Sequence, residues 1–70
     1  MTKFEEEILR VLKIRHPKIE AIHPDTRLDT DSLGLTEICV LAEEYYNKPL
    51  TFAQIKDMDT FSDLMRVIEG

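Results

Sequence analysis

The sequence predicts a small all-α domain, and three observations indicate this fold class. Apolar residues recur at helical spacing in three stretches, at about residues 2–14, 32–46 and 60–68. Three motifs with threonine followed three residues later by Glu, Gln or Asp resemble the capping boxes that begin helices. No alternating β-branched run and no Asn-Gly or Asp-Gly turn predicts a strand or hairpin. We therefore expect a small four-helix bundle with three main helices, one short helix and a long first loop.

Length and composition favour one globular domain. The chain has 70 residues, of which 43% are hydrophobic and 33% charged, close to the lower size at which one core sustains a fold. Little material remains for a deep cleft with catalytic residues, so we expect no enzymatic activity. The single cysteine, Cys39, excludes an internal disulfide and fits a reducing compartment. The N-terminus resembles no signal peptide and no apolar run approaches membrane-spanning length, so we expect a cytoplasmic protein without membrane insertion.

The first helix begins at a capping box formed by Thr2 and Glu5 and continues to about Ile14. Its predicted core face consists of Phe4, Ile8, Val11 and Leu12. Its basic residues are interspersed with glutamates, which is typical of a solvated face; they are Lys3, Arg10, Lys13 and Arg15. Two prolines then predict a loop from residue 16 to 28. The apolar residues of this loop that should fill the core are Ile19, Ile22 and Leu28.

The second helix, predicted from Ser32 to Tyr46 with a stop at Asn47, has two stripes on opposite sides. The predicted core face consists of Leu35, Ile38, Cys39, Ala42 and Tyr46. The opposite stripe consists of Leu33, Glu37, Val40 and Glu44. A solvated face has no need for two large apolar residues, whereas a protein-docking surface does. We therefore expect this second stripe, the docking stripe, to bind partner proteins.

Two further capping boxes predict the remaining helices. The first, at residues 51–54, begins a short helix anchored by Phe52 and Ile55. The second, at residues 60–63, begins the last helix and has Asp63 in place of glutamate. The apolar stripe of this last helix consists of Phe61, Leu64, Met65 and Ile68.

The negative charge lies in the C-terminal part of the chain. The net charge is −5; residues 1–30 carry six basic and six acidic residues, and residues 31–70 carry three against eight. Nucleic-acid binding needs clustered positive charge, so we expect no nucleic-acid partner. The acidity instead favours partners with basic patches, attracted in a manner that salt weakens.

Ser32 stands at the expected start of the second helix, where two roles are open. Serine and aspartate are preferred helix caps, so either Asp31 or Ser32 can accept an amide N–H there. A serine hydroxyl that does not cap faces outward and is accessible. The free amides and dipole of a helix N-terminus stabilise a phosphate by about 0.3–1 kcal/mol. The docking stripe begins beside this hydroxyl, at Leu33, which favours a role in modification.

The residues around Ser32 resemble a family signature. Asp31-Ser32-Leu33, followed by Glu37-Ile38, is similar to the Asp-Ser-Leu-x-x-x-Glu-Leu motif of acyl carrier proteins. The similarity continues through Ala42-Glu43-Glu44-Tyr45-Tyr46, an acidic helix end with aromatic residues. The size of the chain, the order of its four helices and their spacing also agree. The chain thus resembles a single phosphopantetheine-binding carrier domain over residues 1–70, and the resemblance implies a bundle of acyl-carrier type.

The resemblance implies that a phosphopantetheinyl transferase attaches 4′-phosphopantetheine from coenzyme A to Ser32. The thiol of this arm would hold an acyl or aminoacyl thioester, as in fatty acid or secondary metabolite biosynthesis. Asp31 matches the position that helps to seat the transferase. The positions that dock onto basic, apolar patches of acyl- or aminoacyl-loading and transferring enzymes match Leu33, Glu37, Val40 and Glu44, with Glu43 as a weaker candidate. We expect the carrier to be a monomer.

One departure from the family pattern, one rival function and one excluded kind of site complete the sequence analysis. Gly34 departs from the family pattern, resembles D-alanyl carrier proteins in that detail, and suggests that the arm or a partner backbone approaches closely there. The rival function is a non-catalytic helical interaction module in which Ser32 acts only as a helix cap. A metal site is not expected, because the stretch from Asp29 to Gly34 lacks the later carboxylates of a calcium loop and the two loop histidines lack further ligands.

Overall fold

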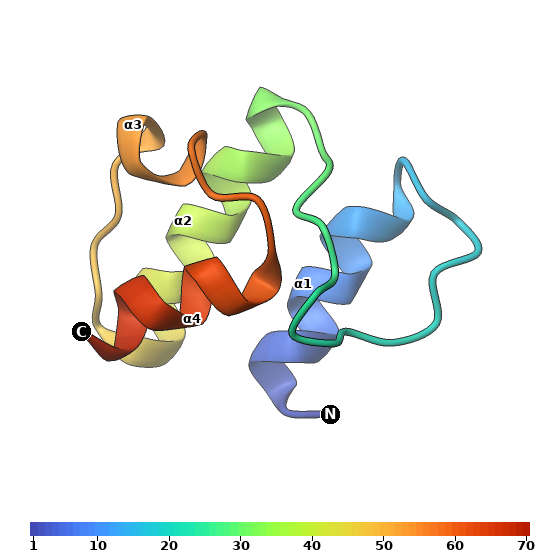
Figure 1. The fold of residues 1–70 in the computed structure, drawn as a ribbon, viewed down its shortest axis with the longest axis horizontal. Coiled ribbons are helices and arrows are strands. Elements are labelled where there is room, and N and C mark those ends of the chain that lie inside the picture. Colours follow the sequence, from blue (N-terminus) through green and yellow to red (C-terminus); the bar gives the residue numbers. More distant parts are fainter.

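The computed structural model describes residues 1–70 and contains four helices and no strand. The helices, shown in Figure 1, are α1 (Lys3–Lys13), α2 (Ser32–Tyr46), α3 (Phe52–Ile55) and α4 (Phe61–Glu69). One isolated antiparallel bridge joins Arg27 of the long loop to Thr60, just before α4. The predicted all-α fold class is therefore confirmed.

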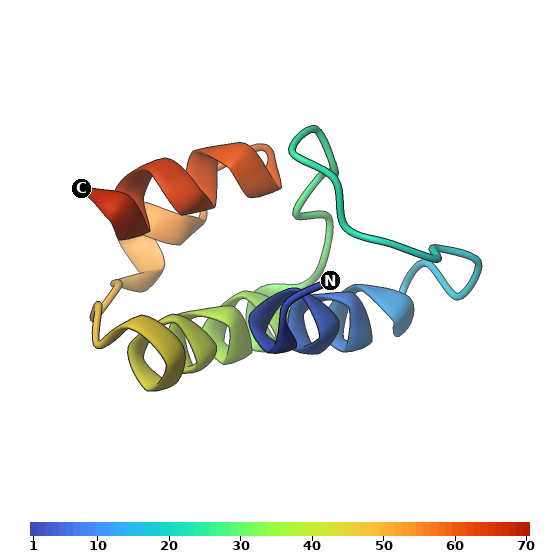
Figure 2. The ribbon, with the colours of Figure 1, turned by 90° about the horizontal axis from the view of Figure 1, so that it is seen from below.

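The helices form two layers around the core. In Figure 2, α1 and α2 form one layer, and α3 and α4 lie across from them. The long loop between α1 and α2 closes one end of the molecule and brings residues 26–28 against the segment that leads into α4 (Figure 1). Two backbone hydrogen bonds fix this contact, from Leu28 N to Asp59 O (2.9 Å) and from Phe61 N to Thr26 O (2.8 Å).

Local hydrogen bonds set the helix boundaries that the sequence predicts. Thr2 Oγ1 accepts from Glu5 N (3.1 Å), while Thr2 N donates to Glu5 Oε1 (2.7 Å). The boxes at residues 51–54 and 60–63 have the same reciprocal pattern. Asn47 ends α2 with a left-handed backbone (φ 53°), a conformation that asparagine tolerates better than most residues.

The core consists of fourteen buried apolar side chains from all four helices and the long loop. They are Phe4, Ile8, Leu9, Val11, Leu12, Ile22, Leu28, Ile38, Leu41, Ala42, Ile55, Phe61, Leu64 and Ile68. The predicted faces of α1 and α4 are therefore confirmed, with Met65 only partly buried. Of the three loop residues, Ile22 and Leu28 are buried, and Ile19 packs against the core from its edge.

The buried face of α2 differs from the predicted one. Leu35 and Cys39 are only partly buried, whereas Leu41, outside the predicted face, belongs to the core. Leu41 lies four residues from Glu37 and four from Tyr45, so these three share one side of the helix. Both neighbours contact α1, Glu37 through an ion pair and Tyr45 through an aromatic contact. A single core face was the wrong expectation, because α1 covers the flank of α2 in addition to the core proper.

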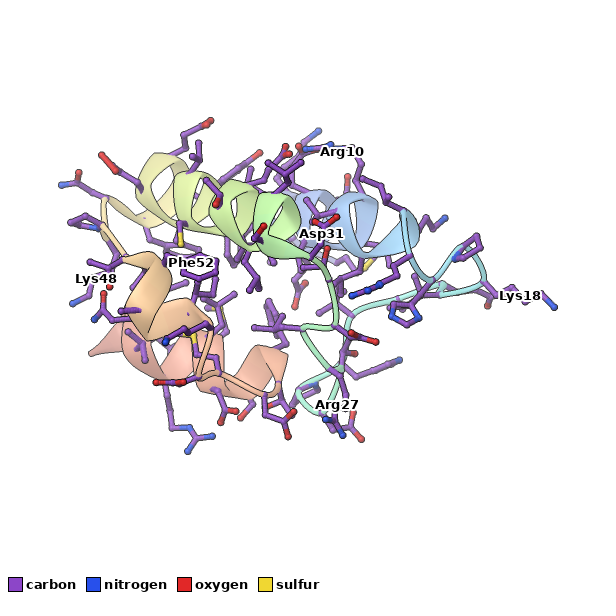
Figure 3. The ribbon with its side chains drawn as sticks, turned by 90° about the horizontal axis from the view of Figure 1, so that it is seen from above. Arg10, Lys18, Arg27, Asp31, Lys48 and Phe52 are labelled. Carbon is purple, nitrogen blue, oxygen red and sulfur yellow. The ribbon has the colours of Figure 1, made fainter.

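Two aromatic residues predicted in the core lie at its rim. Tyr46 is 43% exposed, and its ring meets the ring of Phe4 edge-on at 5.0 Å and 90°. Phe52, predicted as an anchor of α3, is 46% exposed, while Ile55 is fully buried. Phe52 stays at the surface between α3 and α2 (Figure 3).

Candidate functional site

Ser32 is the first residue of α2, and its side chain is exposed. Asp31 takes the cap position: its backbone is extended, and its Oδ1 accepts the Gly34 N–H at 2.9 Å. The Ser32 hydroxyl makes no hydrogen bond within the chain, although the Ser32 carbonyl accepts from Thr36 Oγ1 (2.8 Å). The interpretation of Ser32 as a helix cap is therefore wrong, and its hydroxyl is free at the tip of α2.

Gly34 allows the close packing of the turn that precedes Ser32. A Cβ at Gly34 would lie 2.1 Å from Thr30 Oγ1 and 2.8 Å from Thr30 Cγ2, inside van der Waals contact. The space beside Gly34 is therefore occupied by Thr30 of the same chain, and the expectation of a close approach by an arm or a partner backbone is corrected. Thr30 packed on Gly34, together with the Asp31 cap, fixes residues 30–34 and hence the direction of Ser32.

The docking stripe is exposed along its whole length, as predicted. Leu33 is 79% exposed and Val40 50%, and both Glu37 and Glu44 are exposed. At a rise of 1.5 Å per residue, the stripe runs about 18 Å from Ser32 to Glu44. Large apolar side chains alternate with carboxylates over this distance, which suits a protein partner with apolar and cationic groups.

Arg10 of α1 contacts the docking stripe at Glu37. Arg10 lies on a face that the sequence predicts to be solvated, so this contact was not predicted. Its Nη2 lies 2.7 Å from Glu37 Oε1 and 3.1 Å from Glu7 Oε1. Hydrogen bonds to Glu37 and then Glu7 raise the pKa of Arg10 above its ordinary value. Figure 3 places Arg10 on the outer side of the α1–α2 layer, away from α3 and α4. Glu37 is therefore the one glutamate of the stripe that is paired within the chain.

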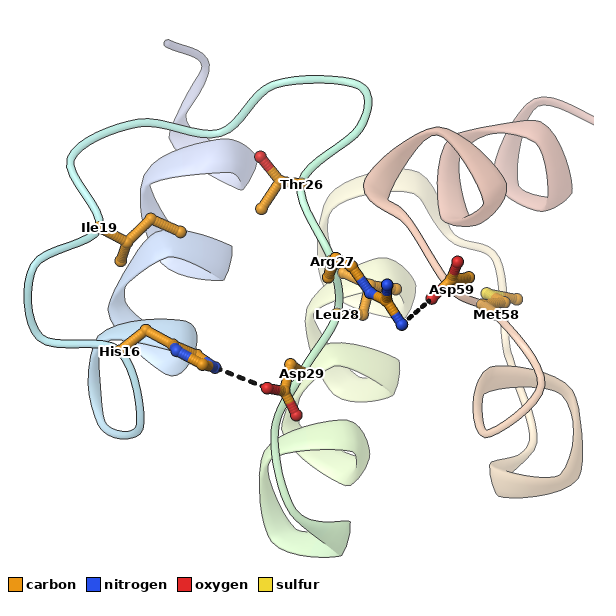
Figure 4. A pocket seen from close by; sticks show the side chains of 8 residues that line it. All are labelled: His16, Ile19, Thr26, Arg27, Leu28, Asp29, Met58 and Asp59. Atoms are coloured by element: carbon orange, nitrogen blue, oxygen red, sulfur yellow. Dashed lines mark hydrogen bonds and ion pairs between the residues drawn. The ribbon is translucent and has the colours of Figure 1, made fainter.

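A cavity of about 730 Å³ lies beside the segment that leads to Ser32 (Figure 4). His16 Nε2 lies 2.9 Å from Asp29 Oδ2, and Arg27 Nη2 lies 3.0 Å from Asp59 Oδ1. These two pairs connect the segment on one side to the end of α1 and on the other to the linker before α4. Both pairs are exposed, so they brace residues 27–29 rather than forming a buried charged site.

No chemically activated group accompanies Ser32. Partial burial raises the pKa of the Cys39 thiol, which stays protonated at neutral pH and lies 4.0 Å from the carbonyl oxygen of Thr51. The two histidines lie in the long loop, and no three His, Cys, Asp or Glu residues are placed to hold a metal ion. The geometry offers an accessible hydroxyl, to which a group could be transferred, and beside it an exposed stripe of apolar and acidic side chains.

Comparison with known proteins finds no match for this chain. No protein-family model matches the chain, and neither a curated protein nor a solved structure is significantly similar to it. No helix has the length and apolar character needed to cross a membrane. The function is therefore inferred from the residues and their arrangement.

Proposed function

We propose that the chain is a carrier domain that holds an acyl or aminoacyl thioester on a 4′-phosphopantetheine arm attached to Ser32. The observation that supports this most is the free, exposed hydroxyl of Ser32 at the start of α2. Serine at the start of a helix can act as its cap, but here Asp31 takes the cap position and Ser32 follows it as the first helical residue. The hydroxyl therefore has no structural task, and it stands next to Leu33, the first residue of the docking stripe.

The residues around Ser32 suit a phosphodiester. The N–H groups of Ser32 and Leu33, the first two of α2, have no acceptor within the helix, and with the helix dipole they favour a negatively charged group by about 0.3–1 kcal/mol. Asp31 lies beside this position, but its Oδ1 is occupied by the Gly34 N–H. Ser32 Oγ would form the new bond to phosphorus as the bond to the 3′,5′-ADP of coenzyme A breaks. Its proton would pass to a base of the transferase, because the Ser32 hydroxyl makes no hydrogen bond to a histidine or carboxylate of this chain.

The docking stripe supplies the partner surface that such a carrier needs. Its exposed apolar residues, Leu33 and Val40, would enter apolar patches, and its carboxylates would meet cationic groups. Phosphopantetheinyl transferase and the enzymes that load or remove the thioester are the proposed partners. Docking would be weak and fast, because each enzyme in turn has to release the same carrier.

The decisive experiment is modification in vitro. The purified protein is incubated with coenzyme A and a broad-specificity phosphopantetheinyl transferase, and its intact mass is recorded. We expect the mass of one phosphopantetheine to be added, with none added to Ser32→Ala. Ser62→Ala is the matched control, since Ser62 is the only other serine and lies in the first turn of α4. No gain with several transferases, or a gain in Ser32→Ala, would contradict the proposal.

An interaction module that uses the same stripe without any arm is the second candidate, favoured by the exposure of Leu33 and Val40. It differs from the carrier in how Ser32→Ala behaves. An interaction module would bind its partner equally well after this substitution, because Asp31 and not Ser32 caps α2. A carrier would keep its fold but accept no arm and deliver no thioester.

A further inference from the structure

We propose that Arg10 determines which carboxylate of α2 attracts a partner, by holding Glu37 and leaving Glu44 free. This inference rests on the proposed function and specifies the partner: its cationic group should face the C-terminal half of α2. The part of the stripe near Ser32 would then contribute mainly the apolar contact of Leu33. Arg10 would thus be a specificity-determining residue that lies outside the stripe itself.

The ion pairs of the chain support the first part of the proposal. Arg10 Nη2 contacts Glu37 Oε1 at 2.7 Å, the shortest distance between any carboxylate of α2 and a basic group. Glu43 and Glu44, both about two turns further along α2, form no ion pair with any residue of the chain. A partner cation that approaches Glu37 must therefore displace or share a guanidinium, whereas one that approaches Glu44 meets a carboxylate with no ion-pair partner in the chain.

The position of Arg10 supports the second part. Glu7, three residues before Arg10 on α1, also accepts from the guanidinium, through both Nε and Nη2. Two carboxylates thus hold Arg10 over the side of α2 that carries Glu37 (Figure 3). Arg10 presents positive charge on the face that a partner must approach, and like charges placed opposite one another weaken association. A partner matched to this surface therefore carries no cation opposite Glu37.

The test measures kcat/KM for modification by the transferase, at low and at high salt. The variants are at Glu37, Glu44 and Arg10. We expect Glu44→Gln to lower kcat/KM about three-fold at low salt, as for one unscreened surface charge, and Glu37→Gln to lower it by less. In an Arg10→Gln background, the loss caused by Glu37→Gln should rise to about that of Glu44→Gln. High salt should remove these differences.

Lys13→Gln is the matched control for Arg10→Gln. Lys13 is an exposed cation in the last turn of the same helix and has no ion-pair partner, so its loss changes only the net charge. Arg10→Gln should therefore raise kcat/KM about two-fold or more above Lys13→Gln. Arg10→Lys keeps the charge without the planar fork that spans two carboxylates and should give an intermediate rate. Circular dichroism checks that each variant retains its helices.

These data distinguish failure of the inference about Arg10 from failure of the proposed carrier function. If the wild-type protein is modified but Glu37→Gln causes the same loss with and without Arg10, the role of Arg10 is refuted and the carrier function stands. The same holds if Arg10→Gln and Lys13→Gln have equal rates. If the wild-type protein accepts no arm from any transferase, the proposed function fails, and the inference about Arg10 fails with it.

Discussion

Replacing Gly34 by alanine tests how the turn before Ser32 is held. The added Cβ would lie 2.1 Å from Thr30 Oγ1 and 3.0 Å from Thr30 Cβ. Because both atoms are close, rotating the hydroxyl of this β-branched residue is not enough, and the backbone of residue 30 or the helix start has to move. Overpacking of this kind typically destabilises a protein by about 1–3 kcal/mol. Alanine recovers up to about 1 kcal/mol through its higher helix propensity.

The expected net loss of stability for Gly34→Ala is therefore about 0.5–2 kcal/mol. For a domain of this size, about 1 kcal/mol corresponds to a fall in Tm of roughly 4–8 °C. Thermal and urea unfolding followed by circular dichroism would measure the change. The double variant Thr30→Ala/Gly34→Ala removes the clash and should recover most of the loss, so the two substitutions should be strongly coupled. A Gly34→Ala protein as stable as wild type, or one that Thr30→Ala fails to rescue, would refute the reasoning.

Three further predictions concern the core, the cap of α2 and the start of α4. Leu41→Ala should lower the free energy of unfolding by about 2–5 kcal/mol in urea titrations. Leu33→Ala should change it by less than about 0.5 kcal/mol. Equal effects of the two substitutions would contradict the burial described for α2. Asp31→Ala should lower the free energy of unfolding by about 0.5–2 kcal/mol through loss of the cap, whereas Ser32→Ala should not. A larger loss for Ser32→Ala than for Asp31→Ala, measured by calorimetry, would contradict the assignment of Asp31 as the cap. Backbone N–H groups of Thr60 and Asp59 lower the pKa of Asp63 below its ordinary value of 3.8. The ionised carboxylate therefore stabilises the fold above about pH 4, and this contribution is lost as the pH falls through the lowered pKa. Asp63→Asn should consequently lower Tm at pH 7 and flatten its fall between pH 4 and pH 2, and parallel Tm–pH curves for the two proteins would argue against this role.

The start of α2 illustrates how far the sequence leads toward the candidate site. Asp31 and Ser32 are both good caps, so residue type alone leaves the role of each undecided. The choice depends on which residue has extended backbone geometry and points an oxygen at the Gly34 N–H, and Asp31 does so. The exposed state of Leu33 and Val40, by contrast, follows from helical periodicity and was predictable.

Phe52 shows the opposite limit. A capping box and two apolar residues correctly predict that a helix begins at residue 52, and Ile55 is buried as expected. Hydrophobicity alone suggests that Phe52 is buried too. Its exposure depends on where α3 meets α2, which the local sequence pattern does not encode.

By itself, the sequence determined the all-α class, the order and boundaries of the helices, and the surface stripe that begins beside Ser32. These features depend on residues three or four positions apart, whose hydrogen bonds and shared faces are set by helix geometry. Only the tertiary structure decided that Leu41 belongs to the core and that Arg10 holds Glu37, a residue 27 positions away. Such contacts arise because α1 packs along the flank of α2, and packing between distant segments leaves no periodic trace in the sequence.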